Sequence, residues 1–259
     1  MPEGVRDPRL VDAVSEWLAL NRDLLSVHRL RNLFRSESGS AKEPVSILRG
    51  VEKRAKRFVT ASKALEPDPM LPSNLAVRLR LLMDAGSRSE VARFLLTWPG
   101  SEADAHHVAG AAAFAKRNVN DILLSFVRAR VVVEAWAGNR RLFSADKQRW
   151  CAFLGLRPEE LPGYVPWIRL FRATVRILRW LDDAELADKS RYLRSSGARD
   201  LIEDVRADLV ACGVDVPDPQ RYPGDASLGS LDDLVSELTA LLTADGALGP
   251  LKESSGHSV

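Results

Sequence analysis

SRSEVARFLLTWPGSEADAHHVAGAAAFAKRNVNDILLSFVRARVVVEAWAGNRRLFS, residues 87–144, is the stretch that decides the fold. It begins with an amphipathic pattern in which Val91, Phe94 and Leu95 share one face at helical spacing. Ser87 precedes them and can cap the first turn through its hydroxyl. The sequence therefore predicts a first helix that ends before the proline and glycine of the WPG segment.

A second, shorter helix is expected directly after this break. Asp104 is placed to cap it, because an aspartate side chain can accept hydrogen bonds from the free amides of a first helical turn. Small residues occupy its inward positions, which suits a close helix crossing: Val108, Ala109 and Ala112. A turn at Ala113-Phe114 then leads into a third helix.

The third helix has the clearest division between its two faces. Its inward positions are apolar: Val119, Ile122, Leu123, Phe126 and Val127. Its start has polar and cationic residues on the outward side: Lys116, Arg117, Asn118 and Asn120. A cationic, amide-rich helix start is suited to contacts with DNA, so this segment is the candidate recognition helix.

Two β-prone runs follow, at 131–133 and 141–143. The segment between them contains a Gly-Asn pair typical of a tight hairpin turn, and it places Arg140 and Arg141 at the hairpin tip. Three helices followed by such a ribbon predict a winged helix-turn-helix. The fold class expected is mainly α, with a small β-hairpin wing and with helical regions on both sides.

The segments AKRNVNDILLSFVRARVV and GNRRLFSADKQRW resemble the MarR/ArsR-like winged-helix regulators. The resemblance covers about a fifth to a quarter of the chain and implies a DNA-binding transcriptional regulator. That family often caps the recognition helix with Ser or Thr and leaves it through a left-handed Gly, where this chain has Ala115 and Arg130. Leu124 stands where the family usually has a polar residue, so we expect another helix, of this chain or of a partner, to cover it.

In such a complex the start of the third helix enters the major groove, where arginine matches guanine and asparagine matches adenine. The wing arginines are expected to contact phosphates or a minor groove. The expected DNA-binding residues are Lys116, Arg117, Asn118, Asn120, Arg140 and Arg141. One winged helix has a small footprint, so we expect a homodimer on double-stranded DNA. A winged helix that serves only protein contacts is the alternative.

Composition indicates a folded chain whose charge is unevenly distributed. The 259 residues are 46% hydrophobic and carry a net charge of +2. Residues 87–141 contain 8 Lys/Arg against 5 Asp/Glu, whereas residues 142–259 contain 14 against 19. Residues 1–60 contain 12 against 8. The excess of positive charge therefore belongs to the first part of the chain, as DNA contact requires.

Linker-like segments suggest four regions. Pro-rich stretches separate the central domain from its helical neighbours, and the end of the chain is small and polar. The expected regions are an N-terminal helical region at 1–72, the winged helix-turn-helix at 73–155, a C-terminal helical domain at 164–245 and a flexible tail at 246–259.

Helical periodicity also predicts the flanking elements. A long helix is expected over 11–34, a basic helix over 44–65, a helix over 74–85 closed by Gly86, and a helix that follows the wing behind Ser144. The basic helix carries Lys53, Arg54, Lys56 and Arg57, which either form a solvated face or add phosphate contacts.

Four more helices are expected in the C-terminal domain. Residues 167–181 carry a broad apolar stripe, which we interpret as internal core. Residues 183–212 are expected to split into two helices near Ser195-Ser196-Gly197, and residues 230–243 form a last helix that could dock or dimerise.

No motif for catalysis is apparent, so the chain is not expected to be an enzyme and no cofactor is expected. His106 and His107 are adjacent and lack acidic or thiol neighbours at ligand spacing, which disfavours a metal site. Cys151 and Cys212 are expected to be reduced, buried thiols of a cytoplasmic protein with no membrane contact. A DNA-binding antitoxin, or a protein-interaction adaptor of a two-gene system, is the second functional hypothesis.

Overall fold

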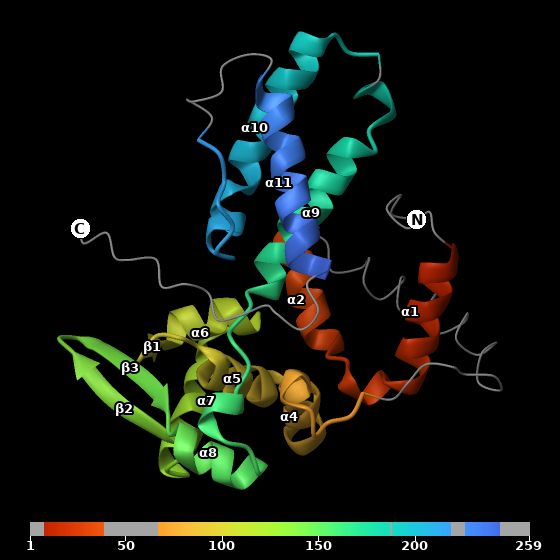
Figure 1. Ribbon diagram of the computed structural model, residues 1–259. Helices are drawn as coiled ribbons and strands as arrows, with labels where there is room; N and C mark the ends of the chain where they lie inside the picture. Colours follow the sequence, from red (N-terminus) through yellow and green to blue (C-terminus); the bar gives the residue numbers. More distant parts are fainter. Residues whose placement is uncertain (1–7, 39–66, 187, 219–225, 244–259) are drawn as a thin grey trace. The chain divides into compact units, whose positions relative to one another are not determined.

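The computed structural model describes residues 8–38, 67–186, 188–218 and 226–243 (Figure 1). The chain divides into two compact units, Val5–Pro162 and a second unit from Gly163 onward. Each unit is described by itself. The expected basic helix over 44–65, with Lys53, Arg54, Lys56 and Arg57, and the expected tail from 246 lie outside the described residues.

The chain is mainly helical, with one small antiparallel sheet of three strands. The first unit contains, in chain order, α1 (Pro8–Leu20), the 3-10 turn η1 (Arg22–Leu24), α2 (Val27–Ser38), η2 (Pro72–Asn74), α4 (Leu75–Met83), α5 (Ser87–Thr97), β1 (Ala103–Asp104), α6 (Ala105–Ala112), α7 (Lys116–Arg128), β2 (Val132–Ala137), β3 (Arg140–Ala145), α8 (Lys147–Leu154) and η3 (Pro158–Glu160). The second unit contains α9 (Trp167–Leu181), η4 (Ala184–Leu186), α10 (Arg191–Val210) and α11 (Ala226–Thr243).

Helices α5, α6 and α7 pack around a shared apolar core, and their predicted inward residues are buried. Val91 and Phe94 of α5, Val108 of α6, and Val119 and Leu123 of α7 are all fully enclosed. The predicted cap of α6 is confirmed, because the Asp104 carboxylate accepts a hydrogen bond from the His107 amide at 2.9 Å. The predicted cap of α5 is wrong: Gly86 occupies the cap position and Ser87 is already inside the helix.

The ends of α7 match the expectation from sequence. Ala115 stands at the cap position with no side-chain hydrogen bond, and Arg130 takes the left-handed conformation with φ of 60°. A non-glycine residue in this region is uncommon, and it is tolerated here where the chain turns from α7 into β2. Leu124 is half-buried.

The hairpin of β2 and β3 has a two-residue turn at Gly138-Asn139, so its strands are longer than the β-prone runs suggested. Gly138 has φ of 59°, the conformation that a tight hairpin turn requires of its first residue. Strand β1 was not predicted; it pairs with β3 through the register Ala103↔Phe143 and gives the strand order β1-β3-β2. Two residues carry too little pattern to be recognised as a strand.

Helix α8 begins later than predicted. Ser144 lies in β3, and Asp146 caps the helix by accepting a hydrogen bond from the Arg149 amide at 3.1 Å. At the base of the hairpin, the indole Nε1 of Trp150 donates to the Val131 carbonyl at 2.9 Å. Gly155 ends the helix with φ of 61°.

The predicted single helix over 11–34 is wrong, because α1 ends at Leu20 and α2 starts at Val27. The side-chain amide of Asn21 donates to the Trp17 carbonyl at 3.0 Å, and the Ser26 hydroxyl accepts from the Arg29 amide at 3.2 Å. These side chains satisfy the backbone groups at a helix end and at a helix start, so a break is favoured there despite the continuous amphipathic pattern.

The predicted end of the next helix is also wrong. Helix α4 stops at Met83, and Asp84, with φ of 65°, takes the positive-φ position that we assigned to Gly86. Gly86 instead has an extended backbone and precedes α5.

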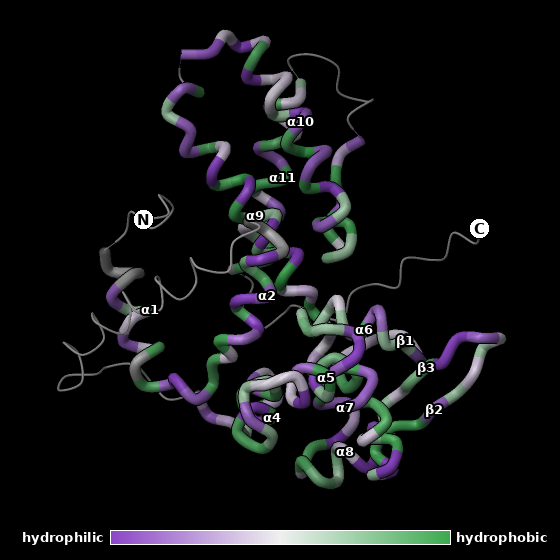
Figure 2. Tube along the Cα trace, turned by 180° about the vertical axis from the view of Figure 1, so that it is seen from behind, coloured by the Kyte–Doolittle hydropathy of each residue, from purple (hydrophilic) through white to green (hydrophobic). Residues whose placement is uncertain are grey.

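The second unit is built from α9, α10 and α11, whose facing sides form one apolar core. Leu170 of α9, Val205 and Leu209 of α10, and Leu231 and Leu234 of α11 belong to it. Figure 2 shows hydrophobic and hydrophilic residues alternating along these helices, as amphipathic packing requires.

The predicted split near Ser195-Ser196-Gly197 is wrong, because α10 runs unbroken from Arg191 to Val210. A Cβ at Gly197 would lie 3.3 Å from the indole Nε1 of Trp180. The glycine therefore permits close packing against α9 and does not mark a turn.

Only part of the apolar stripe on α9 belongs to the core, although we predicted that the whole stripe would be buried. Leu170, Ala173 and Ile177 are buried, whereas Phe171 and Leu178 are more than half exposed. The stripe combines two faces, only one of which packs within the unit.

Both cysteines are free and buried, as predicted. Among the described residues, no helix has the length and apolar character needed to cross a membrane.

Candidate nucleic-acid interface

The start of α7 presents the predicted contact residues to solvent. Lys116, Arg117 and Asn118 are exposed, and Asn120 is half-buried. The buried side chain of Val119 anchors this turn from the opposite face. An exposed polar surface on a firmly packed helix is the arrangement that a recognition helix needs, because the contact groups keep fixed positions.

The cations in this turn are not neutralised by any residue that the structure describes. Within the described residues, Lys116 and Arg117 form no ion pair or hydrogen bond. The first turn of α7 contains no acidic residue and its cap position has no side-chain acceptor. The positive end of the helix dipole and two cationic side chains therefore act at one place, which favours an anion such as a phosphate.

Asn118 is positioned by a neighbouring helix. Its side-chain amide donates to the Ser87 hydroxyl at 3.1 Å, which ties the start of α7 to the start of α5. Arg88 follows Ser87 and is exposed, with no ion pair or hydrogen bond among the described residues. Arg88 was not among the predicted DNA-binding residues, because nothing in the sequence pattern of α5 indicates that the first turn of α5 lies beside α7.

The two arginines of the hairpin lie on opposite faces of the ribbon. Arg141 pairs in register with Trp136 and Arg140 with Ala137, and neighbouring residues of a strand alternate between faces. Figure 1 shows the hairpin extending away from α5, α6 and α7, and Figure 2 shows that its tip is hydrophilic. The arginines are therefore not an equivalent pair, although both lie near the tip.

Each of these arginines has an acidic partner. Arg140 contacts Asp104 at 2.7 Å, and Arg141 contacts Glu134 at 3.1 Å while its guanidinium lies 4.8 Å from the centre of the Trp136 ring. The His107 backbone hydrogen bond, with the Arg140 hydrogen bond second, holds the pKa of Asp104 below its usual value. Arg140 is 72% exposed, and exposed pairs of this kind contribute little, so a phosphate can replace the carboxylate.

Helix α2 braces the turn that precedes α7. Arg29 Nε donates to the Ala112 carbonyl at 3.0 Å, and Asn32 Nδ2 donates to the Ala113 carbonyl at 2.9 Å. The next residue, Phe114, stacks on the His28 ring with 5.7 Å between the ring centres. Ala113 is left-handed, with φ of 59°, so these contacts hold a backbone conformation that alanine does not favour.

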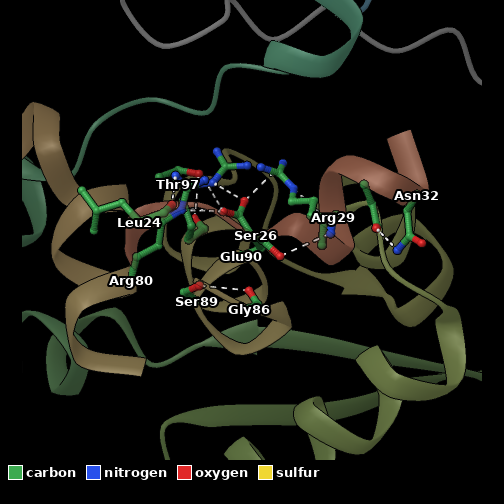
Figure 3. Close-up of polar contacts among 12 residues, drawn as sticks. Leu24, Ser26, Arg29, Asn32, Arg80, Gly86, Ser89, Glu90 and Thr97 are labelled. Atoms are coloured by element: carbon green, nitrogen blue, oxygen red, sulfur yellow. Dashed lines mark hydrogen bonds and ion pairs between the residues drawn. The ribbon is translucent and has the colours of Figure 1, made fainter. Parts of the chain in front are cut away.

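Beside this brace, three arginines surround one buried glutamate (Figure 3). Glu90 of α5 is 2% exposed and contacts Arg29 of α2 at 3.2 Å, Arg80 of α4 at 2.5 Å and Arg93 of α5 at 3.2 Å. Burial raises the pKa of Glu90, but the charges of the three arginines together outweigh this effect and hold it below its usual value. The carboxylate is thus the common ion partner of three helices.

This cluster was not predicted from the sequence. A glutamate next to Val91 on the inward side of an amphipathic helix was the available signal. The arginines that pair with it come from separate segments, so the partners are visible only in three dimensions.

His107 packs against aromatic side chains. Among the described residues, no group of three or more His, Cys, Asp or Glu side chains is arranged to hold a metal ion. The His107 ring instead contacts Trp98 edge to face, with 4.5 Å between the ring centres, and also contacts Phe94. No family model matches the chain, and no curated protein or solved structure matches it either.

Proposed function

We propose that residues 87–145 form a winged helix-turn-helix that binds double-stranded DNA and that the chain is a transcriptional regulator of the cytoplasm. The single observation that carries the proposal is the exposed, unneutralised cationic start of α7. The order of three helices and a hairpin, with the short strand β1 added to the sheet, supports it. So does the resemblance of the α7 segment to MarR/ArsR-like regulators.

In this proposal α7 lies in the major groove and the hairpin reaches the backbone beside it. Arg117 supplies the guanine-specific contact and Asn118 or Asn120 the adenine-specific contact, while Lys116 and Arg88 neutralise flanking phosphates. The chain carries out no catalytic step. Two copies on a two-fold site supply the footprint that one winged helix lacks.

The test is a titration of the full chain against duplex DNA from its own upstream region at several salt concentrations. Binding should weaken steeply with salt, and Lys116→Ala should reduce the slope of log K against log salt by about 0.9, the value for one phosphate contact. Arg199→Ala is the matched control, because it removes an exposed arginine of the second unit that pairs only with Asp200 among the described residues. Absence of duplex binding at low salt would refute the proposal.

A second candidate function has one observation in its favour. The apolar face left exposed on α9 is suited to protein contact, as expected of an antitoxin or an adaptor of a two-gene system. Copurification with the product of an adjacent gene, without binding to duplex DNA, would favour this alternative.

A further inference from the structure

Helix α9 has a second apolar face that no described residue of its own unit covers. Five large side chains on it are 38–57% exposed: Trp167, Phe171, Val175, Leu178 and Leu181. The rings of Trp167 and Phe171 are stacked with 5.5 Å between their centres, so part of this surface is already ordered. A contiguous apolar face of this kind marks an interaction site.

The spacing of this face indicates that its partner is a helix. Trp167, Phe171, Thr174, Leu178 and Leu181 follow one another at steps of four, three, four and three residues. This alternation of steps places the five side chains in one row along the helix, as in coiled coils. We call this row the seam; it can face a neighbouring helix along its whole length.

The seam is also close to symmetric about its middle, between Thr174 and Val175. Phe171 and Leu178 lie at equal distances along the chain from that point, and Trp167 and Leu181 at nearly equal distances. An antiparallel second copy would therefore place Phe171 against the partner's Leu178, as an isologous two-fold contact requires. We propose that a second copy of this chain occupies the exposed face of α9 in this antiparallel arrangement.

The charges around the face are compatible with self-association. Arg172 lies 3.8 Å from Asp208 and Arg176 lies 3.1 Å from Asp204, so these cations are compensated by α10. The first turn of α9 has no acidic residue and no side-chain cap, whereas Asp182 follows its last residue. Antiparallel packing brings this carboxylate to the positive end of the partner helix, which is a favourable position for it.

The size of the face sets the strength of the contact. Aromatic side chains bury 150–250 Å² each when fully enclosed, so five partly exposed residues supply on the order of 400 Å² per subunit. This is about half of the 800 Å² per partner typical of stable complexes. The dimer should therefore dissociate on dilution in the micromolar range, and two adjacent DNA half-sites would promote it.

Cysteine crosslinking of the full chain tests the geometry. Val175→Cys places a thiol beside the two-fold axis, so mild oxidation should join two copies within disulfide range. Trp167→Cys should give no crosslink by itself, because its two copies would be about 22 Å apart along antiparallel helices. A mixture of Trp167→Cys and Leu181→Cys chains should crosslink. The native cysteines are buried and provide the background in the unmodified chain.

Sedimentation velocity supplies a second measurement. The unmodified chain should change from monomer to dimer between about 1 and 100 μM, and Leu178→Glu should remain monomeric with an unchanged circular dichroism spectrum. A crosslink of Trp167→Cys alone, a monomer at every concentration, or a dimer that survives Leu178→Glu would overturn the proposal. None of these readouts uses DNA, so failure of the dimer is distinguishable from failure of DNA binding.

Discussion

Replacing Glu90 with Gln tests whether the stability of the first unit depends on this one carboxylate. The amide has nearly the same shape as the carboxylate, so the side chain fills the same space and only the charge is lost. Three arginines from α2, α4 and α5 would then face each other around a neutral, 2% exposed side chain. Removing one partner of a buried ion pair leaves uncompensated charge, which costs about 3–5 kcal/mol.

The number of partners predicts an asymmetry between the glutamate and its arginines. Arg93→Met keeps an apolar stem of similar length and leaves Glu90 with Arg29 and Arg80. One charge-assisted hydrogen bond is lost, for which we expect a cost of about 1.5–3 kcal/mol. The free energy of unfolding should therefore fall further in Glu90→Gln than in Arg93→Met.

Urea unfolding measures the free energy of unfolding of both variants. Hydrogen exchange of the α5 amides then shows whether the unfolding transition belongs to this unit. Glu134→Gln is the control, because its partner Arg141 is 35% exposed and the pair lies on the hairpin. It should change stability by less than about 1 kcal/mol. Equal losses in Glu90→Gln and Arg93→Met, or a loss below 1 kcal/mol in Glu90→Gln, would refute the reasoning.

The same cluster predicts the direction of a pH effect. The pKa of Glu90 is lower in the folded chain than its ordinary value of 4.5, so the folded state binds this proton less readily than the unfolded state. Its contribution to stability is fully present above about pH 4.5 and is lost as pH falls through the folded-state pKa. The difference in stability between the unmodified chain and Glu90→Gln should consequently shrink below pH 4.5.

Two further substitutions address the proposed DNA contact. Arg117→Ala should weaken discrimination between the preferred duplex and a scrambled one by about 1–3 kcal/mol, and more than Arg141→Ala does, in competition binding. Equal effects would contradict the assignment of Arg117 to base contact. Asn32→Ala should speed hydrogen exchange of the amides at 112–118 and lower DNA affinity, whereas Arg31→Ala, on the exposed side of the same helix, should do neither. Unchanged hydrogen exchange in Asn32→Ala would show that α2 does not support the proposed DNA-binding site.

The central helices were predictable because their determinants are local. The apolar spacing of α7, the cap at Asp104 and the Gly-Asn turn each act within a few residues, and each was found where the sequence placed it. The left-handed Arg130 was also predictable, since the chain must leave α7 without a glycine.

The predictions were wrong where side-chain hydrogen bonds or contacts with distant segments determine the secondary structure. Asn21 and Ser26 compete for backbone groups within an otherwise continuous amphipathic pattern, and Gly197 permits packing against Trp180 without breaking its helix. Strand β1 exists because β3 pairs with it, which no local pattern records.

Arg29 connects the stability of the unit to the proposed site. Its guanidinium contacts the buried Glu90 and also donates to Ala112, in the turn before α7. The start of α7 therefore has two supports from outside its own helix, α2 through this turn and α5 through the Asn118 contact with Ser87. A ligand or partner that displaced α2 would therefore have two effects together. It would expose the charge of Glu90, and it would free the left-handed turn at Ala113 from its hydrogen bonds with α2. Because both contacts share one arginine, DNA affinity and stability should decline together in Arg29→Ala, and a decline in only one of them would show that the two supports act independently.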